Sequence, residues 1–296
     1  MHPRSALVRP LDPAWPTNRA VIFLMPLGGL ATAAAVWSFE RPDALAVFWA
    51  AAVGAGVVFG TWALARELAP DDQRAAFVAM AFGFATSLLV VGASLSLLFA
   101  ALFLARVVNR TVGPPATVVD AVAVLALVGW AAVSTQSPDL WMAAALAFAL
   151  DAHLSGGRPR QWAFAAACLV LMVGQLAYPL TIGTARAEIA AGTGSPGMAG
   201  IVWALPVAAV FIATILRTRS LDSVADATGA PLSVLRVRAG MIVVLLFTAR
   251  SLLHGDEGVI HSVFLWSVLG GVTLSDLLPG RRRPREHARS LPAPPE

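Results

Sequence analysis

Apolar residues fill long uninterrupted runs of this chain, and charged residues gather at the joints between the runs. A bilayer core about 30 Å thick is crossed by roughly 20 helical residues, and these runs are close to that length. Charges confined to joints are typical of helices that face lipid, whereas a soluble helix carries a polar stripe along its length. We expect helices at residues 20–38, 44–65, 74–90, 92–109, 117–134, 138–154, 161–179, 198–216, 239–254 and 258–277.

This pattern predicts an all-α fold, a polytopic transmembrane bundle of about ten helices. Residues 20–277 form a single transmembrane helical domain in this interpretation, and residues 1–19 precede it as a cytoplasmic segment. The prolines and Asp12 of that segment do not form the short basic stretch of a cleavable signal, so the first apolar run is expected to remain as a helix.

The stretch from Ala75 to Ala105 is the ambiguous part of the pattern, because its 31 residues contain no polar joint. One helix of this length would be about 46 Å long, which exceeds the bilayer core. A turn near Gly92 and Ser94 would instead produce two short spans.

The arginines decide between these alternatives through the positive-inside rule. With a hairpin at Gly92 and a cytoplasmic N-terminus, only Arg41 and Arg186 fall in outer loops, whereas a single long helix would reverse every later loop. The hairpin is therefore strongly favoured. It predicts that both ends of the chain are cytoplasmic and that the protein is a multi-pass protein of the inner, cytoplasmic membrane.

Composition supports the same class, since 58% of the residues are hydrophobic and only 13% are charged. The net charge is +4, but about a quarter of the arginines lie in the segment 278–296, without a folded basic face. We therefore expect no nucleic-acid partner. The segment reads as a disordered basic tail that contacts anionic lipids of the inner leaflet, so membrane lipids are the expected partners.

Two weaker patterns concern helix starts and helix packing. The segments Gly113–Val119 and Gly229–Leu235 share the pattern Gly-x-Pro-x-Thr/Ser-Val-aliphatic, with Thr117 and Ser233 placed to cap a following helix. Two similar helix starts explain the likeness more simply than a duplicated unit does. Gly56-x3-Gly60 permits close helix packing, either within the chain or between two copies.

The densest polar cluster is predicted at the outer side, between the last two helices. Two histidines and two carboxylates around one tight turn suit a divalent cation or proton transfer, but their spacing matches no specific metal motif. The alternative is an exposed turn with an arginine whose head reaches outward. The residues are Arg250, His254, Asp256, Glu257 and His261.

Three aspartates lie near the inner ends of helices. Asp120 is in a first helical turn, where a carboxylate favours the helix dipole. Asp151 and Asp276 are near C-terminal ends, where a carboxylate is disfavoured and needs a cationic partner. Arg158 and Arg281 are the expected partners, and structural pairing is favoured over a proton or ion pathway.

Two inner loops carry acidic residues that could hold Mg²⁺ and a diphosphate headgroup, as in membrane-embedded lipid and isoprenoid transferases. In each loop two acidic residues are separated by three others, as in Glu67-x3-Asp71 and Asp222-x3-Asp226. The residues around them do not match the pattern of such an enzyme, and solvated helix caps are the simpler interpretation. The residues are Glu67, Asp71 and Asp72 in one loop, and Asp222 and Asp226 in the other.

Three functions remain open from the sequence. The leading hypothesis is a non-catalytic membrane protein that handles a small solute or ion, with its polar site around His254 and His261. The alternatives are a lipid or isoprenoid enzyme that uses the inner carboxylates, and a structural subunit of a membrane complex. The residues near the expected membrane midplane are almost all apolar, and the sequence identifies no cofactor and no protein partner.

Overall fold

The chain forms an all-helical bundle in the computed structural model, which describes residues 5–8, 11–40, 43–90, 92–182 and 198–278. Within these ranges no strand forms. The α-helices are α1 (Pro16–Glu40), α2 (Ala44–Leu68), α3 (Gln73–Leu89), α4 (Leu95–Asn109), α5 (Val118–Ser134), α6 (Leu140–His153), α7 (Pro159–Ile182), α9 (Met198–Arg217), α10 (Val234–Ala249), α11 (Gly255–His261) and α12 (Val263–Leu277). A 3-10 turn, η1 (Arg250–His254), joins α10 to α11.

Membrane-spanning length is clear for four helical segments, each at least 18 residues long and strongly apolar. They are Pro16–Ser38, Ala44–Leu68, Pro159–Ala177 and Val234–His261. The other apolar helices are shorter, with 10–17 residues each among those that the structure describes. The expectation of an all-helical chain is confirmed within the described ranges, and four helical segments are long and apolar enough to cross a membrane.

The stretch from Ala75 to Ala105 contains two helices, as the arginine distribution indicated. The chain turns between Leu89 and Leu95, where Gly92 has a φ of 91° that a side chain rarely tolerates. The amide of Ser94 donates a hydrogen bond of 2.9 Å to the carbonyl of His261, so the turn is attached to the last part of the chain.

Two predicted boundaries need correction. The helix expected at 239–254 begins at Val234, directly after Ser233, whose side chain accepts a hydrogen bond from the amide of Arg236. The helix expected at 258–277 is interrupted at Ser262, which separates α11 from α12. The caps at Thr117 and Ser233 are both confirmed, and Thr117 forms a capping box with Asp120.

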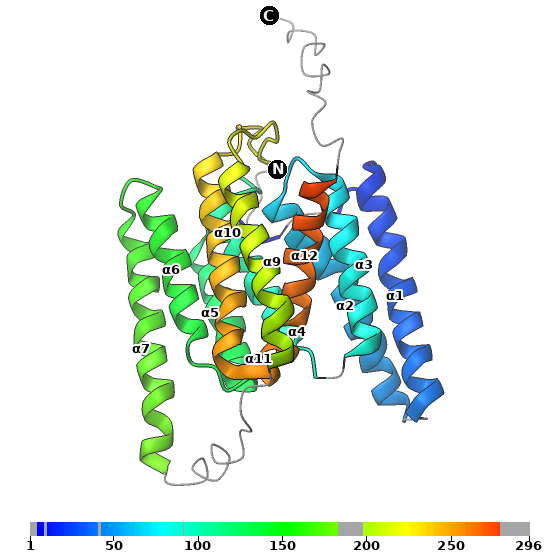
Figure 1. Ribbon diagram of the computed structural model, residues 1–296. Helices are drawn as coiled ribbons and strands as arrows, with labels where there is room; N and C mark the ends of the chain where they lie inside the picture. The colour runs from blue at the N-terminus through cyan, green and yellow to red at the C-terminus, as the bar shows by residue number, and fades with distance from the viewer. Residues whose placement is uncertain (1–4, 9–10, 41–42, 91, 183–197, 279–296) are drawn as a thin grey trace, which may run out of the picture.

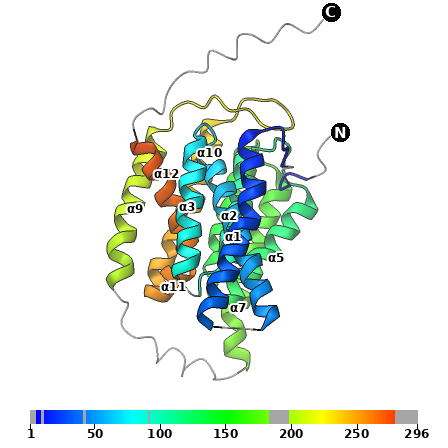
Figure 2. The same cartoon turned by 90° about the vertical axis from the view of Figure 1, so that its right-hand side faces the viewer.

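Helix α4 is the central element of the bundle and lies against α2, α5, α6, α10 and α12. Its residues from Leu97 to Asn109 are almost all buried. Figure 1 shows α1, α2 and α3 on one flank and the α6–α7 pair on the other, and Figure 2 shows the same bundle from the side. Gly56 and Gly60 face Leu95 and Leu98, so packing within the chain explains that motif.

The described beginning and end of the chain lie at the same end of the bundle, together with the α2–α3, α4–α5, α6–α7 and α9–α10 connections (Figure 1). Arg66, Arg110 and Arg217 lie at the helix termini there, so we call it the arginine-rich end. The opposite end carries the α5–α6 connection and α11. Of the predicted basic tail, 278–296, all residues after Leu278 lie outside the described residues.

Close packing between α3 and α12 depends on Gly271. A Cβ atom at this position would lie 2.5 Å from the backbone N and Cα of Ala79, which cannot move aside. We expect Gly271→Ala to lower the stability of the purified protein by about 1–3 kcal/mol, because the two helices would have to separate. Thermal unfolding in detergent measures this change.

The adjacent glycine is the matched control. A Cβ at Gly270 would meet only Phe82, at an ordinary contact distance of 3.9 Å. Gly270→Ala should therefore leave the unfolding temperature unchanged or slightly raised. Equal destabilisation by both substitutions would contradict the packing described for this pair of helices.

Candidate functional site

Buried charges at the arginine-rich end surround the C-terminus of α4. Arg106 Nε donates to Glu67 Oε1 at 3.0 Å, and both side chains are almost completely buried. Thr111 donates to the other carboxylate oxygen of Glu67, and Asn109 donates to the Glu67 carbonyl at 2.8 Å. These contacts satisfy a carboxylate that burial would otherwise make very unfavourable. Glu67, a candidate Mg²⁺ ligand from sequence, therefore has a structural role.

The segment before α1 closes over this network. Asp120 accepts hydrogen bonds from Ser5 Oγ and from the Ala6 amide, the latter at 3.0 Å, in addition to its capping box. Arg106 donates to the carbonyl of Leu7. Ala6 and Leu7 are buried as a result. Asp120 lies in the first turn of α5, as expected, and the structure adds its capping box with Thr117 and its contact with residues 5 and 6.

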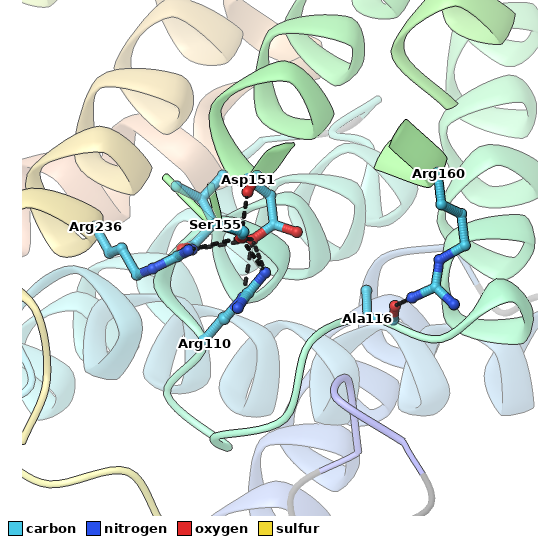
Figure 3. Close-up of polar contacts among 7 residues, drawn as sticks. Arg110, Ala116, Asp151, Ser155, Arg160 and Arg236 are labelled. Carbon is cyan, nitrogen blue, oxygen red and sulfur yellow. Dashed lines mark hydrogen bonds and ion pairs between the residues drawn. The ribbon is translucent and has the colours of Figure 1, made fainter. Parts of the chain in front are cut away.

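Asp151 joins two arginines from different helices, and we call these residues with Ser155 the Asp151 cluster (Figure 3). Its Oδ1 atom lies 2.7 Å from Arg110 Nη2 and 2.9 Å from Arg236 Nη1. Ser155 Oγ accepts hydrogen bonds from both guanidinium groups and donates to the Asp151 carbonyl. The prediction that Arg158 pairs with Asp151 is wrong, because Arg110 and Arg236 form these ion pairs. The α4 and α10 arginines are closer because these helices pack against α6.

Positive charge exceeds negative charge in the Asp151 cluster. The Asp151 side chain is fully buried, while those of Arg110 and Arg236 are 15% and 12% exposed. Burial lowers the pKa of Arg110, Asp151 partly compensates, and the charges of Arg236 and Arg158 lower the pKa further. A guanidinium nevertheless stays protonated in proteins. Two cations therefore share one carboxylate.

Arg236 and Arg238 also bind the C-termini of neighbouring helices. Arg236 donates to the carbonyl of Val108 at 2.9 Å, near the end of α4. Arg238 donates to the carbonyls of Ile215 and Leu216 at the end of α9. The last carbonyls of a helix have no partner within the helix, and a cation also favours the negative end of its dipole. These two contacts are accordingly structural.

Asp276 has a partner, as its position near a helix C-terminus requires. Its Oδ2 atom lies 3.4 Å from Arg217 Nη1 and accepts a hydrogen bond of 3.0 Å from Thr214. The predicted partner, Arg281, lies outside the described residues. Because α9 packs against α12, Arg217 reaches Asp276 across 59 residues of sequence.

The two acidic loops meet, but not as a pair of facing carboxylates. Asp71 accepts hydrogen bonds from the amides of Asp222 and Ser223, each at 2.9 Å, and from Ser223 Oγ. Asp72 caps α3 and accepts a hydrogen bond of 2.6 Å from Ser275. The amide of Asp226 donates to the carbonyl of Thr111. The capping interpretation is thus confirmed for Asp72, and Asp71 attaches the second loop to the first.

The opposite end contains an ion pair that the sequence analysis missed. Arg250 Nη1 lies 3.3 Å from Asp139 Oδ2, and His254 Nε2 lies 3.2 Å from Asp139 Oδ1. Asp139 immediately precedes α6, and Arg250 begins η1. The Arg250 guanidinium also lies over the Phe247 ring, 5.5 Å from its centroid. An acidic residue next to a helix start was the available signal for Asp139, but its partner is 111 residues away.

The remaining members of the predicted outer cluster have other neighbours. Asp256 accepts a hydrogen bond of 3.1 Å from the amide of Gly200, and the His261 carbonyl binds Ser94. Within the described ranges, no group of three or more histidine, cysteine, aspartate or glutamate side chains is spaced to hold a metal ion. A metal site at His254, Asp256, Glu257 and His261 stays a prediction without structural support.

An open apolar groove of about 400 Å³ lies between α3, α9 and α12. Trp203 and Trp266 contribute to its lining and contact each other edge to face, with ring centroids 5.7 Å apart. Thr86 and Ser267 supply hydroxyl groups, 3.1 Å apart. The groove is open and its lining is almost entirely apolar, so it suits an apolar group.

Comparison with known proteins provides no further assignment. No protein-family model, curated protein or solved structure matches this chain.

We expect Asp71→Ala to release the loop at residues 222–223. The substitution removes the acceptor of two backbone amides, so hydrogen exchange at Asp222 and Ser223 should accelerate roughly three- to tenfold. Asp222→Ala is the control, because this side chain is exposed and its amide keeps its acceptor. Unchanged exchange in Asp71→Ala would show that other contacts hold the loop.

Asp139 should make stability depend on acidic pH. Burial opposes its ionisation, but the His254 hydrogen bond and the Arg250 charge outweigh this effect and lower the pKa of Asp139. A lowered folded-state pKa stabilises the fold above the ordinary value of 3.8, and this contribution is lost as the pH falls through the folded-state pKa. We expect Asp139→Asn to cost about 2 kcal/mol near neutral pH and much less at the acidic limit.

Unfolding temperatures of the native chain and Asp139→Asn, compared from pH 7 down to pH 3, measure this dependence. The difference between the two proteins should shrink as the pH falls. Asp43→Asn is the control, because Asp43 caps α2 at the same end of the bundle without an ion pair among the described residues. A difference that stays constant with pH would contradict the assigned ion pair.

Proposed function

We propose that this chain is a multi-pass protein of the cytoplasmic membrane, with ten crossings and both ends in the cytoplasm. The arginine distribution supports this orientation. Among the described arginines, only Arg250 lies at the end opposite the arginine-rich end. Positively charged connections remain on the cytoplasmic side of membranes. The arginine-rich end then faces the cytoplasm.

The lengths of the inner helices are compatible with ten crossings. Helix α4 has 15 residues and is about 22 Å long, which is shorter than a typical bilayer core. It contacts five other helices, so neighbouring protein surrounds it in place of lipid. The longer helices α1 and α7 are largely exposed and are the ones whose length must match the lipid.

We further propose that the protein binds a small solute at its cytoplasmic end without catalysing a reaction. The excess of positive charge in the Asp151 cluster is the observation that carries this proposal. The sequence had suggested a polar site at the outer cluster around His254, but there Asp139 already compensates Arg250. We therefore propose the site on the opposite side of the membrane. Among the described residues, the middle parts of the helices are apolar and offer no continuous polar path across the bundle. Binding at one end is therefore favoured over transport through it.

A lipid or isoprenoid enzyme is the second candidate, because Asp71 brings the two acidic loops into contact. The contact joins a carboxylate to backbone amides, and Glu67 is occupied by Arg106 and Thr111. This arrangement leaves few carboxylate oxygens to bind Mg²⁺ and a diphosphate. It therefore favours solute binding over catalysis.

The orientation can be tested with single cysteines in a Cys168→Ala background, since Cys168 is buried and is the chain's only cysteine. A membrane-impermeant thiol reagent should label Ser134→Cys, at the end of α5, in intact cells. Arg158→Cys, in the α6–α7 connection, should react only after the membrane is opened. Labelling of Arg158→Cys in intact cells would reverse the proposed orientation.

A further inference from the structure

We infer that the Asp151 cluster binds a phosphate-type oxyanion. The inference rests on the proposed function, because it names the class of solute that the same site takes. The first argument is the imbalance of charge. Both guanidinium contacts fall on Oδ1 of Asp151, while Oδ2 is buried and has no hydrogen-bond partner among the described residues. Figure 3 shows this second oxygen turned away from Arg110 and Arg236. One oxygen atom therefore holds two cations together without neutralising both.

The guanidinium groups keep donors for a ligand. The hydrogen bonds of Arg110 to described residues use Nε and Nη2, so its Nη1 atom remains for another acceptor. Those of Arg236 use Nη1 and Nη2, which leaves Nε. Planar guanidinium groups suit phosphate oxygens because their N–H groups point in fixed directions. Asp151 and Ser155 preorganise the two groups, which reduces the entropy lost on binding.

The cluster lies beside an exposed turn. Gly156 and Gly157 follow Ser155 with φ of 76° and 83°, and both are exposed. A Cβ at either glycine would meet nothing within 4 Å, so no neighbouring residue among those described covers this turn. Arg158 is exposed, and it is close enough to Arg110 for its charge to lower the pKa of Arg110. Arg160 is excluded from the site, because its guanidinium donates to the Ala116 carbonyl away from Asp151 (Figure 3).

The charge of the cluster also discriminates between ligand classes. A divalent cation would be repelled by two guanidinium groups less than 3 Å from the carboxylate oxygen. A phosphate can accept hydrogen bonds from Arg110 and Arg236 together, as charge-assisted bonds that exceed neutral ones in strength. Both a free phosphate in the cytoplasm and the headgroup of a phospholipid at the inner leaflet provide this chemistry. The experiment must therefore offer both.

Binding is measured on the purified full-length chain with two probes. The first is inorganic phosphate, titrated calorimetrically against protein in neutral detergent. The second is phosphatidic acid at a low fraction in phosphatidylcholine nanodiscs, read as a rise in unfolding temperature over nanodiscs of phosphatidylcholine alone. We expect saturable binding of at least one probe. Binding of phosphate alone identifies a free solute, and a response to phosphatidic acid alone identifies a lipid headgroup.

Three variants connect binding to the cluster. Arg110→Lys keeps the charge but loses the planar fork, and Ser155→Ala leaves both ion pairs in place. Arg110→Lys should weaken binding by about ten- to a hundredfold. Ser155→Ala should weaken it by about threefold or more. Arg238→Lys is the matched control, since Arg238 lies in the same helix as Arg236 but binds the end of α9. It should bind like the native chain. Each variant is first checked for an unchanged elution profile and unfolding transition.

Two results would overturn the inference. One is the absence of saturable binding of both probes to the native chain. The other is equal binding by the native chain and by folded Ser155→Ala and Arg110→Lys. If Arg110→Lys does not fold, Ser155→Ala alone decides the second result, because it removes no charge. Neither result bears on the orientation, which the cysteine labelling tests separately, so failure of the inference and failure of the topology are distinguishable.

Discussion

Compensation of buried charge at the C-terminus of α4 is the interaction on which the rest of this structure depends. Arg106 reaches back to Glu67 of α2, and Arg110 reaches forward to Asp151 of α6. Arg236 of α10 joins the second pair and also binds the carbonyl of Val108. A single charge left without a partner in this apolar interior would cost several kcal/mol. The helices around α4 can therefore pack only in an arrangement that brings these groups together.

The same requirement explains why the segment before α1 lies against the bundle. Leu7 supplies a carbonyl to Arg106, and Asp120 supplies a carboxylate to Ser5 and Ala6. Both contacts use charged side chains, the guanidinium of Arg106 in α4 as donor and the carboxylate of Asp120 in α5 as acceptor. The loop between α9 and α10 is held in a similar way, by Asp71 and by the carbonyl of Thr111. Polar contacts thus concentrate at one end of the bundle.

The two ends differ in how completely their charges are compensated. At the end opposite the arginine-rich end, Arg250 and His254 contact different oxygens of the Asp139 carboxylate. At the arginine-rich end, two guanidinium groups share one oxygen of Asp151. A compensated pair gives stability, whereas an excess of oriented donors favours an anion. This difference is the basis for proposing an anion site at the arginine-rich end.

Features that depend on residues close together in the sequence could be predicted from the sequence alone. Long apolar runs predict membrane helices, because lipid requires every backbone group to bond within its own segment. Thr117 and Ser233 predict helix starts, because a cap binds amides two or three positions later. The turn near Gly92 followed from the sides on which arginines must lie. For Asp151 and Asp276, the need for a cation was also evident, since both are near the negative ends of helix dipoles.

Tertiary structure alone decided which partners meet those needs. Arg110 and Arg236 are 41 and 85 residues from Asp151, and Asp139 is 111 residues from Arg250. Any of the arginines at the same end of the bundle had the chemistry to bind Asp151, so composition and spacing could not choose among them. The choice follows from which helix faces pack together, and that depends on side-chain shapes across the whole bundle. Sequence therefore determined the elements and their unpaired charges, and packing determined the pairs.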